Sequence, residues 1–294
     1  MMSEPVFGRL LTAMVTPFDG ERKLDLDKAK VLAAHLVDDM NNDGLVISGT
    51  TGEAPTTSPQ EKFDLLSAVK AEVGDRAKLV AGVGTNDTAA SVELARQAEQ
   101  AGADGLLVVT PYYSLPPQEM IIDHFVAIAD ATSLPVILYD IPHRTGRPIE
   151  TESLITLARH PRIRAVKDAK KNFDASSRVM AETDLAYYAG DDAITLPLMS
   201  VGGVGVIGTS THFTGRRTHE LIDAFCRADT AEALRLHRML LPIFTGVFAT
   251  QGCMMVKAGL AHQGLDVGAC RPPLQSAPAE LAEVFAGLLD AADL

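Results

Sequence analysis

The chain has no tryptophan, few aromatic residues and no excess of positive charge. Aromatic residues make up 5% of it, and the formal net charge is −12 at pH 7. A nucleic-acid surface needs clustered Lys and Arg, often with aromatic side chains for stacking, and a chain of this charge repels a phosphate backbone. We therefore expect no nucleic-acid partner. An anionic substrate would have to be bound by local cationic and N–H groups.

Cysteine and long apolar runs are also scarce. The three cysteines, Cys226, Cys253 and Cys270, show no spacing typical of metal ligands, which predicts free thiols in a reducing compartment and no metal site. No segment approaches the ~18 uninterrupted apolar residues of a membrane span. The stretch Met1–Pro5 has neither the basic nor the apolar region of a signal peptide. We expect a cytoplasmic protein without a membrane partner.

The chain does contain a regular alternation of short apolar segments and longer amphipathic ones. The apolar segments predict strands at Leu10–Met14, Gly44–Ile47, Leu79–Ala81, Gly105–Val109, Val136–Tyr139, Ile163–Lys167, Ala186–Ala189 and Gly205–Ile207. Eight strands alternating with helices are typical of a (β/α)8 TIM barrel, whereas a doubly wound sheet usually has fewer strands. We predict an α/β barrel catalytic domain over residues 1–229.

The helical segments carry their own start signals. In Ser58–Val73, Ser58 can cap the helix, with proline at the first helical position and Glu61 completing a capping box. Beyond about Thr230 the strand signals stop. Further helices are expected at 87–100, 231–248, 253–262 and 278–291. The last three predict a C-terminal helical extension, residues 230–294, as a second domain.

Lys167 is the most informative single residue. It ends the apolar run Ile163–Val166, which places its amine at the mouth of the predicted barrel. A free lysine has a pKa of about 10.4, and lowering it to about 7 costs about 4 kcal/mol, which a desolvated pocket can supply. A lysine of this kind forms Schiff bases with carbonyl substrates. The alternative is a lysine whose ammonium extends into water, and the neighbouring residues decide between the two.

Several other polar groups follow the carboxyl ends of the strands, where TIM barrels place their active sites. The turn Gly49–Gly52 offers N–H groups and hydroxyls that suit a carboxylate, although a plain turn fits equally well. Tyr139 suits proton transfer, or else simply lines the barrel. Arg144 suits a carboxylate clamp, or else lies on a surface loop. Tyr112 and Tyr113 follow strand four.

Some suggestive residues are set aside. His143 lies beside an arginine in a loop, where histidine is commonly incidental. Asp191 and Asp192 lack a third ligand at metal spacing, so we interpret them as structural or supporting groups. The glycine-rich stretch 202–205 precedes a strand instead of linking a strand to a helix, which excludes a dinucleotide-binding loop. No cofactor is expected.

Together these segments resemble the class I pyruvate-dependent aldolase and lyase family of dihydrodipicolinate synthase and N-acetylneuraminate lyase. The resemblance runs from about Gly8 to Pro273 and rests on the ordered motifs GTTGE, TPYY, YDIPxRTG, VKDA and GDD. It is strongest to the dihydrodipicolinate synthase branch. That branch condenses pyruvate with L-aspartate 4-semialdehyde to 4-hydroxy-tetrahydrodipicolinate, in lysine and diaminopimelate biosynthesis. The resemblance implies a lyase of this kind, without cofactor, assembled as a homotetramer built from two dimers.

The resemblance also implies a role for each matching residue. Lys167 would form the imine with pyruvate, and Tyr139, Thr50 and Tyr113 would relay protons, with Tyr113 reaching into a neighbouring subunit's site. The substrate-binding residues would be Thr50 and Thr51 for the pyruvate carboxylate, Arg144 for the semialdehyde carboxylate, and Gly190 and Ile207 along the pocket.

The chain departs from the family pattern at several positions. Ala54 and Gly208 stand where serine is usual, and His143 fills a variable position. Members inhibited by lysine place histidine and glutamate in an interface pocket. The matching positions here are Pro59, Lys62 and Ala90, although Asn86 and Tyr112 remain. We expect feedback by lysine to be weak or absent, because the effector's charged groups would lack partners.

Two other functions stay open at this point. A related Schiff-base aldolase acting on a sugar acid or on N-acetylneuraminate typically has serine in place of Thr50 and lacks the arginine at 144. A non-catalytic paralogue would be expected to lose members of the set Lys167, Tyr139, Thr50 and Tyr113, which is intact here.

Overall fold

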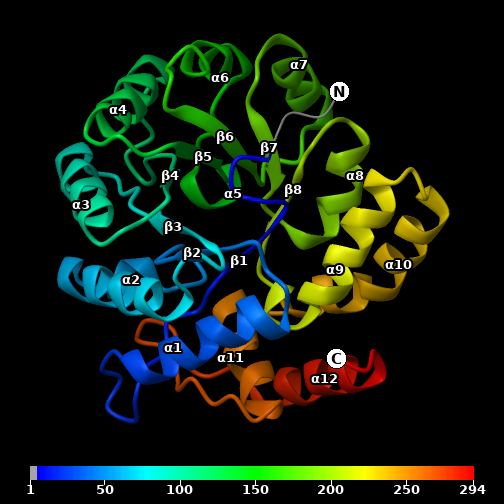
Figure 1. The fold of residues 1–294 in the computed structure, drawn as a ribbon. Coiled ribbons are helices and arrows are strands. Elements are labelled where there is room, and N and C mark those ends of the chain that lie inside the picture. The colour runs from blue at the N-terminus through cyan, green and yellow to red at the C-terminus, as the bar shows by residue number, and fades with distance from the viewer. Residues whose placement is uncertain (1–4) are drawn as a thin grey trace.

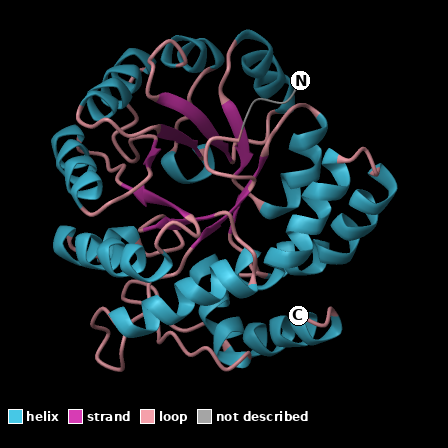
Figure 2. Cartoon of the chain, in the orientation of Figure 1, coloured by secondary structure: helices cyan, strands magenta, loops and turns pink. Residues whose placement is uncertain are grey.

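The computed structural model describes residues 5–294, which form a closed barrel of eight parallel strands in sequential order from β1 to β8. The strands lie in the centre of the molecule and the helices surround them (Figures 1 and 2). The strands are β1 Leu10–Ala13, β2 Gly44–Ile47, β3 Lys78–Gly82, β4 Gly105–Val109, β5 Val136–Asp140, β6 Ile163–Asp168, β7 Ala186–Ala189 and β8 Gly205–Gly208. The predicted fold class is confirmed.

The helices of the barrel follow the strands in turn. They are α1 Leu26–Ala34, α2 Pro59–Val73, α3 Thr88–Gln100, α4 Gln118–Asp130, α5 Pro142–Thr145, α6 Thr151–Leu157, α7 Phe173–Glu182, α8 Thr195–Ser200 and α9 Thr211–Cys226. The C-terminal helices are α10 Thr230–Gly246, α11 Gly252–His262 and α12 Ala279–Ala291. Short 3-10 turns at Ala54–Thr56 and Asp192–Ile194 and a π-helical turn at His35–Asp39 complete the elements.

The predicted element bounds differ from the observed ones by only one or two residues. Strands β5 and β6 each extend one residue further than predicted, because Asp140 and Asp168 continue the parallel pairing of Tyr139 with Lys167. The short helices α5 and α8 were not predicted, since segments of four and six residues show too little periodicity to be detected.

Two apolar cores hold the fold together. One fills the barrel interior with side chains such as Leu11, Val46, Ile137 and Ile207, and the other lies between the barrel and its helices. At the amino-terminal end of the strands, the Tyr188 hydroxyl donates to the Gly8 carbonyl at 2.9 Å. The barrel interior is therefore filled by apolar side chains, as is usual for this fold.

The C-terminal helices extend the barrel on one side. Helix α10 packs against α9, and α11 packs against α12. In Figure 1, α11 and α12 lie at the bottom of the view near α1. The division into domains at residues 229 and 230 stays a prediction. None of the helices within residues 5–294 has the length and apolar character that crossing a membrane requires.

Helix α2 begins with the predicted capping box. The Glu61 N–H donates to Ser58 Oγ at 3.2 Å, and the Ser58 N–H donates to Glu61 Oε2 at 2.8 Å. These two bonds satisfy N–H groups that the first turn of a helix leaves without partners.

We predict that Ser58→Ala lowers the free energy of unfolding by about 1 kcal/mol, because it removes the capping acceptor. Urea unfolding monitored by circular dichroism measures the change. Ser58→Asp is the matched control, since aspartate also caps and should retain most of the stability. Equal losses in both variants would contradict a capping role.

Candidate active site

Lys167 and Tyr139 lie side by side at the carboxyl end of the barrel. The two residues are paired across β5 and β6, and Lys167 Nζ lies 4.4 Å from the centre of the Tyr139 ring. Both side chains are 5% exposed. The parallel register therefore places an amine and a phenol together in a site from which most water is excluded.

The site shifts the pKa of both groups. Burial lowers the pKa of Lys167 to about 8, with Asp192 opposing the shift and Arg144 adding to it. Burial raises the pKa of Tyr139 to about 12, while Arg144 and the neighbouring Thr50 hydroxyl lower it. At neutral pH a useful fraction of Lys167 is therefore the unprotonated nucleophile, and Tyr139 keeps its proton.

A cavity of about 710 Å³ opens above this pair. Of the residues predicted for the site, those that line it are Thr50, Thr51, Tyr139, Arg144, Lys167 and Gly190. A smaller adjoining cavity of about 230 Å³ shares Thr50, Tyr139 and Arg144 and adds Tyr112. Most of the predicted set thus converges on one space, although it comes from four different strands or the loops after them.

Two predicted residues lie elsewhere. Ile207 is fully buried in the barrel interior, in the same apolar cluster as Tyr139. Tyr113 is 90% exposed, has a backbone φ of +73°, and does not line the cavity of its own chain. Nothing within the single chain brings Tyr113 to Lys167.

The cavity has a cationic side. Arg144 projects from the short helix α5, and Lys171 Nζ forms an ion pair with Asp191 Oδ2 at 2.6 Å. His143, which the sequence analysis set aside, lines the same cavity, and burial together with the charges of Arg144 and Lys171 lowers its pKa. This side of the cavity suits a substrate carboxylate.

Asp192 holds Thr209, which lines the cavity, and the adjacent Ser210 by hydrogen bonds. Its buried carboxylate accepts hydrogen bonds from the N–H groups of Thr209 and Ser210 and from Ser210 Oγ. Thr209 in turn lies against Thr51, with 3.3 Å between the two hydroxyls. The structural role predicted for Asp192 agrees with these bonds. A β-carbon at Gly208 would lie 2.5 Å from Thr211 Cγ2 and 2.6 Å from Asp192 Oδ1, so a side chain there would require these groups to move.

The sequence analysis did not identify the residues that hold the Thr50–Thr51 turn in place. Glu53 ends that turn with a φ of +55°, and its Oε1 lies 2.8 Å from Lys257 Nζ on α11. The Arg271 N–H donates to Glu53 Oε2 at 2.8 Å. Lys257 could have been noticed as the one charged residue in the apolar segment 252–261, because such a residue requires a buried partner.

The C-terminal helices also supply part of the cavity wall. Phe244, Thr245, Phe248 and Thr250, from α10 and the segment after it, line the larger cavity. Helical periodicity predicted α10 but gave no sign that one of its faces reaches the barrel mouth.

The comparisons with known proteins can be set beside this geometry. The model of the dihydrodipicolinate synthetase family matches residues 6–292. This chain belongs to that family. The family predicted from the sequence motifs is confirmed.

Relatives of known name are similar over their whole length. A 4-hydroxy-tetrahydrodipicolinate synthase of Cutibacterium acnes is 62% identical over 293 residues, 100% of both chains. One of Acidothermus cellulolyticus is 61% identical over 93% of this chain and 89% of its own. A dihydrodipicolinate synthase of Cyanidioschyzon merolae, solved with lysine bound, has a TM-score of 0.96 at 38% identity and covers 99% of this chain and 100% of its own.

We predict that Glu53→Gln lowers the free energy of unfolding by about 3–5 kcal/mol, because it leaves the buried Lys257 ammonium without its counter-ion. Chemical unfolding measures the loss. The matched control is Glu21→Gln, which breaks the exposed Glu21–Lys23 pair and should change stability little. The double variant Glu53→Gln/Lys257→Met should recover part of the loss. A small effect of Glu53→Gln would contradict the structural role of the pair.

Proposed function

We propose that this chain condenses pyruvate with L-aspartate 4-semialdehyde to give 4-hydroxy-tetrahydrodipicolinate, with Lys167 as the Schiff-base lysine. The observation that carries the proposal is the buried amine of Lys167, with its pKa of about 8, beside Tyr139 in a cavity that has a cationic side. The function and enzyme class predicted from the sequence agree with the names of relatives that are up to 62% identical.

The chemistry follows from an unprotonated amine in a dry site. Lys167 attacks the ketone carbon of pyruvate, and loss of water gives an iminium. Removal of a methyl proton gives an enamine, which attacks the aldehyde carbon and converts the aldehyde oxygen to a hydroxyl. The amine of the semialdehyde then displaces Lys167 and closes the ring. The iminium serves as the electron sink, so these steps require no cofactor.

The surrounding residues take positions that suit this sequence. Tyr139, whose pKa is about 12, holds a proton that it can give to the carbinolamine, and Thr50 is its neighbour. The N–H groups and hydroxyls of the Thr50–Thr51 turn suit the pyruvate carboxylate, and Arg144 suits that of the semialdehyde. Gly190 lines the cavity beside them, and Ile207 supports Tyr139 from the barrel interior.

Tyr113 completes the proposed proton relay only in an assembly. Its exposed side chain is consistent with insertion into the site of a second copy, and we keep the expectation of a homotetramer built from two dimers. The alternatives, a sugar-acid or N-acetylneuraminate aldolase and a non-catalytic paralogue, are not favoured by the relatives or by Thr50, Arg144 and the intact lysine site.

We predict that the purified protein consumes pyruvate with L-aspartate 4-semialdehyde and not with N-acetylmannosamine. Lys167→Ala should reduce turnover to background, because no other group supplies the imine nitrogen. Lys23→Ala, at an exposed lysine, is the matched control and should keep full activity. Turnover with N-acetylmannosamine alone would move the assignment to the sugar-acid aldolases, and no turnover with either would favour the paralogue.

We also predict that imine formation at Lys167 accelerates as the pH rises through about 8. Below that pH the amine is protonated, so the rate should fall about tenfold for each pH unit. The measurement is reductive trapping of pyruvate with borohydride, followed by peptide mapping of the modified lysine. A midpoint near the ordinary lysine pKa of about 10.4 would show that burial does not tune the amine.

We predict that millimolar L-lysine leaves the activity nearly unchanged. At the position of the family's effector pocket, Lys62 Nζ donates to the Ala54 carbonyl at 2.9 Å and to Thr57 Oγ1 at 2.8 Å. A resident cation there repels the ammonium of a lysine effector, and Ala90 offers no carboxylate in compensation. Steady-state assays with added L-lysine test this, and half-inhibition at or below millimolar lysine would contradict it.

A further inference from the structure

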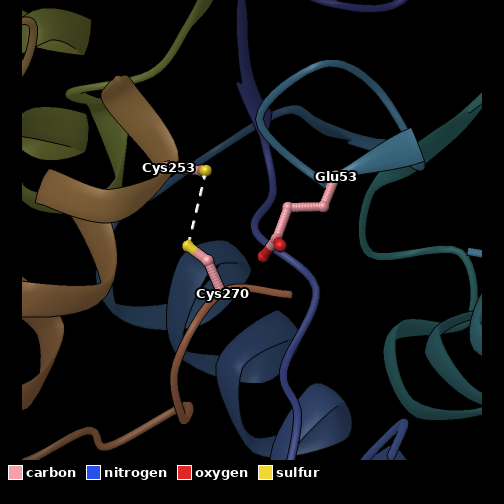
Figure 3. A group of neighbouring side chains, drawn as sticks. All are labelled: Glu53, Cys253 and Cys270. Carbon is pink, nitrogen blue, oxygen red and sulfur yellow. Dashed lines mark hydrogen bonds between the residues drawn. The ribbon is translucent and has the colours of Figure 1, made fainter. Parts of the chain in front are cut away.

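Two of the three cysteines face each other behind the proposed active site. Cys253 is the second residue of helix α11, and Cys270 lies in the segment between α11 and α12 (Figure 3). Their sulfur atoms are 3.6 Å apart, and the two residues are 1% and 0% exposed. The sequence predicted free thiols but gave no sign that residues 17 positions apart would meet.

The Glu53 carboxylate completes this cluster, and the three side chains could in principle hold a metal ion. The Lys257 ammonium, however, lies 2.8 Å from Glu53 Oε1, and Glu53 Oε2 already accepts the Arg271 N–H. A divalent cation here would face the lysine at close range and would have one ligand fewer than a structural zinc site. The cluster therefore suits thiol chemistry better than metal binding.

We infer that Cys253 and Cys270 form a modification site at which a peroxide closes a reversible intrachain disulfide. The peroxide oxidises one thiol to a sulfenic acid and releases one water. The second thiol attacks that sulfur, forms the S–S bond and releases another water. The two cysteines together lose two protons and two electrons, which reduce the peroxide to water. A dithiol reductant reverses the reaction by exchange.

Formation of the disulfide would affect the Thr50–Thr51 turn through the contacts of Glu53. The two sulfurs must approach by about 1.6 Å to reach bonding distance. Cys270 lies between Ala269, whose carbonyl accepts from Lys257 Nζ at 3.3 Å, and Arg271, whose N–H donates to Glu53. Movement of Cys270 therefore disturbs both groups that hold Glu53, and through Glu53 the turn itself.

The third cysteine provides an internal reference. Cys226 is exposed on α9, whereas the hydrogen bond to Cys270 and burial raise the pKa of Cys253 and make its thiolate scarce. We expect an exposed thiol to react first and the buried pair more slowly. A small oxidant such as hydrogen peroxide is required, because bulky disulfide reagents do not reach buried sulfur atoms.

The test uses the full-length Cys226→Ser protein, in which only the buried pair remains. Treatment with hydrogen peroxide should remove both thiols and lower the intact mass by two hydrogen atoms. It should also link the peptides that contain Cys253 and Cys270, and dithiothreitol should reverse the change. In Cys226→Ser/Cys270→Ser no link should form. Two thiols that persist at ten times the peroxide exposure that fully oxidises Cys226 in the unmodified chain would overturn the inference.

A second experiment tests whether the same cluster binds zinc. Tight equimolar zinc binding to the reduced Cys226→Ser protein, with both thiols protected from alkylation, would replace the disulfide site with a metal site. No binding is the expected result.

Two further measurements distinguish formation of the disulfide from its effect on the proposed active site. Closing a loop of 17 residues should raise the melting temperature by about 5 °C in the oxidised protein. We expect a lower kcat/KM for pyruvate, and this effect alone rests on the proposed function. A mapped disulfide with unchanged turnover would keep the site and overturn its coupling to Glu53. If neither form turns over pyruvate, the proposed function fails, while the peptide mapping still decides the disulfide.

Discussion

The buried ion pair between Glu53 and Lys257 is the contact on which the arrangement of the site depends. It joins the turn after β2, which carries Thr50 and Thr51, to helix α11, more than two hundred positions later in the chain. Lys257 Nζ also lies 4.4 Å from the centre of the Phe18 ring, and the Arg271 guanidinium covers the same ring at 4.2 Å. A charge pair buried to this depth stabilises only when both partners are present and well placed, so the C-terminal helices and the barrel mouth form one unit.

Lys167 is also a buried lysine, but its surroundings differ from those of Lys257. No carboxylate of residues 5–294 lies within ion-pair distance of Lys167, and burial lowers its pKa. The buried Asp192 opposes that shift from a distance while its oxygens are occupied by Thr209 and Ser210. Lys257 is thus ion-paired, whereas Lys167, for which we propose the reactive role, has no ion-pair partner among residues 5–294. This difference between the two lysines arises from the groups around each amine and not from the residue type.

The open end of the barrel depends on close approach of backbones and on side chains from the C-terminal helices. Glycine at 82 lets β3 pass close to the loop after β2, where a β-carbon would lie 2.4 Å from the Ser48 carbonyl oxygen. Close approach of backbones brings the strand ends together, and the loops after them then share the two cavities. The C-terminal helices close one side with Phe244 and Phe248. The barrel and the C-terminal helices therefore both form walls of the cavity.

The barrel, the order of its strands and the meeting of most predicted site residues at its open end all follow from sequence patterns. Short, nearly continuous apolar runs that are buried on both faces, separated by amphipathic helices, permit few other folds. Residues that follow parallel strands must meet at one end of the barrel. Lys167, Tyr139, Thr50, Thr51, Arg144 and Gly190 could be predicted for that reason. Only the tertiary structure decided which distant residues support them. The Glu53–Lys257 pair, the contact of Thr51 with Thr209 and the meeting of Cys253 with Cys270 arise from helix packing, and local sequence patterns carry no information about which buried side chains come to face each other.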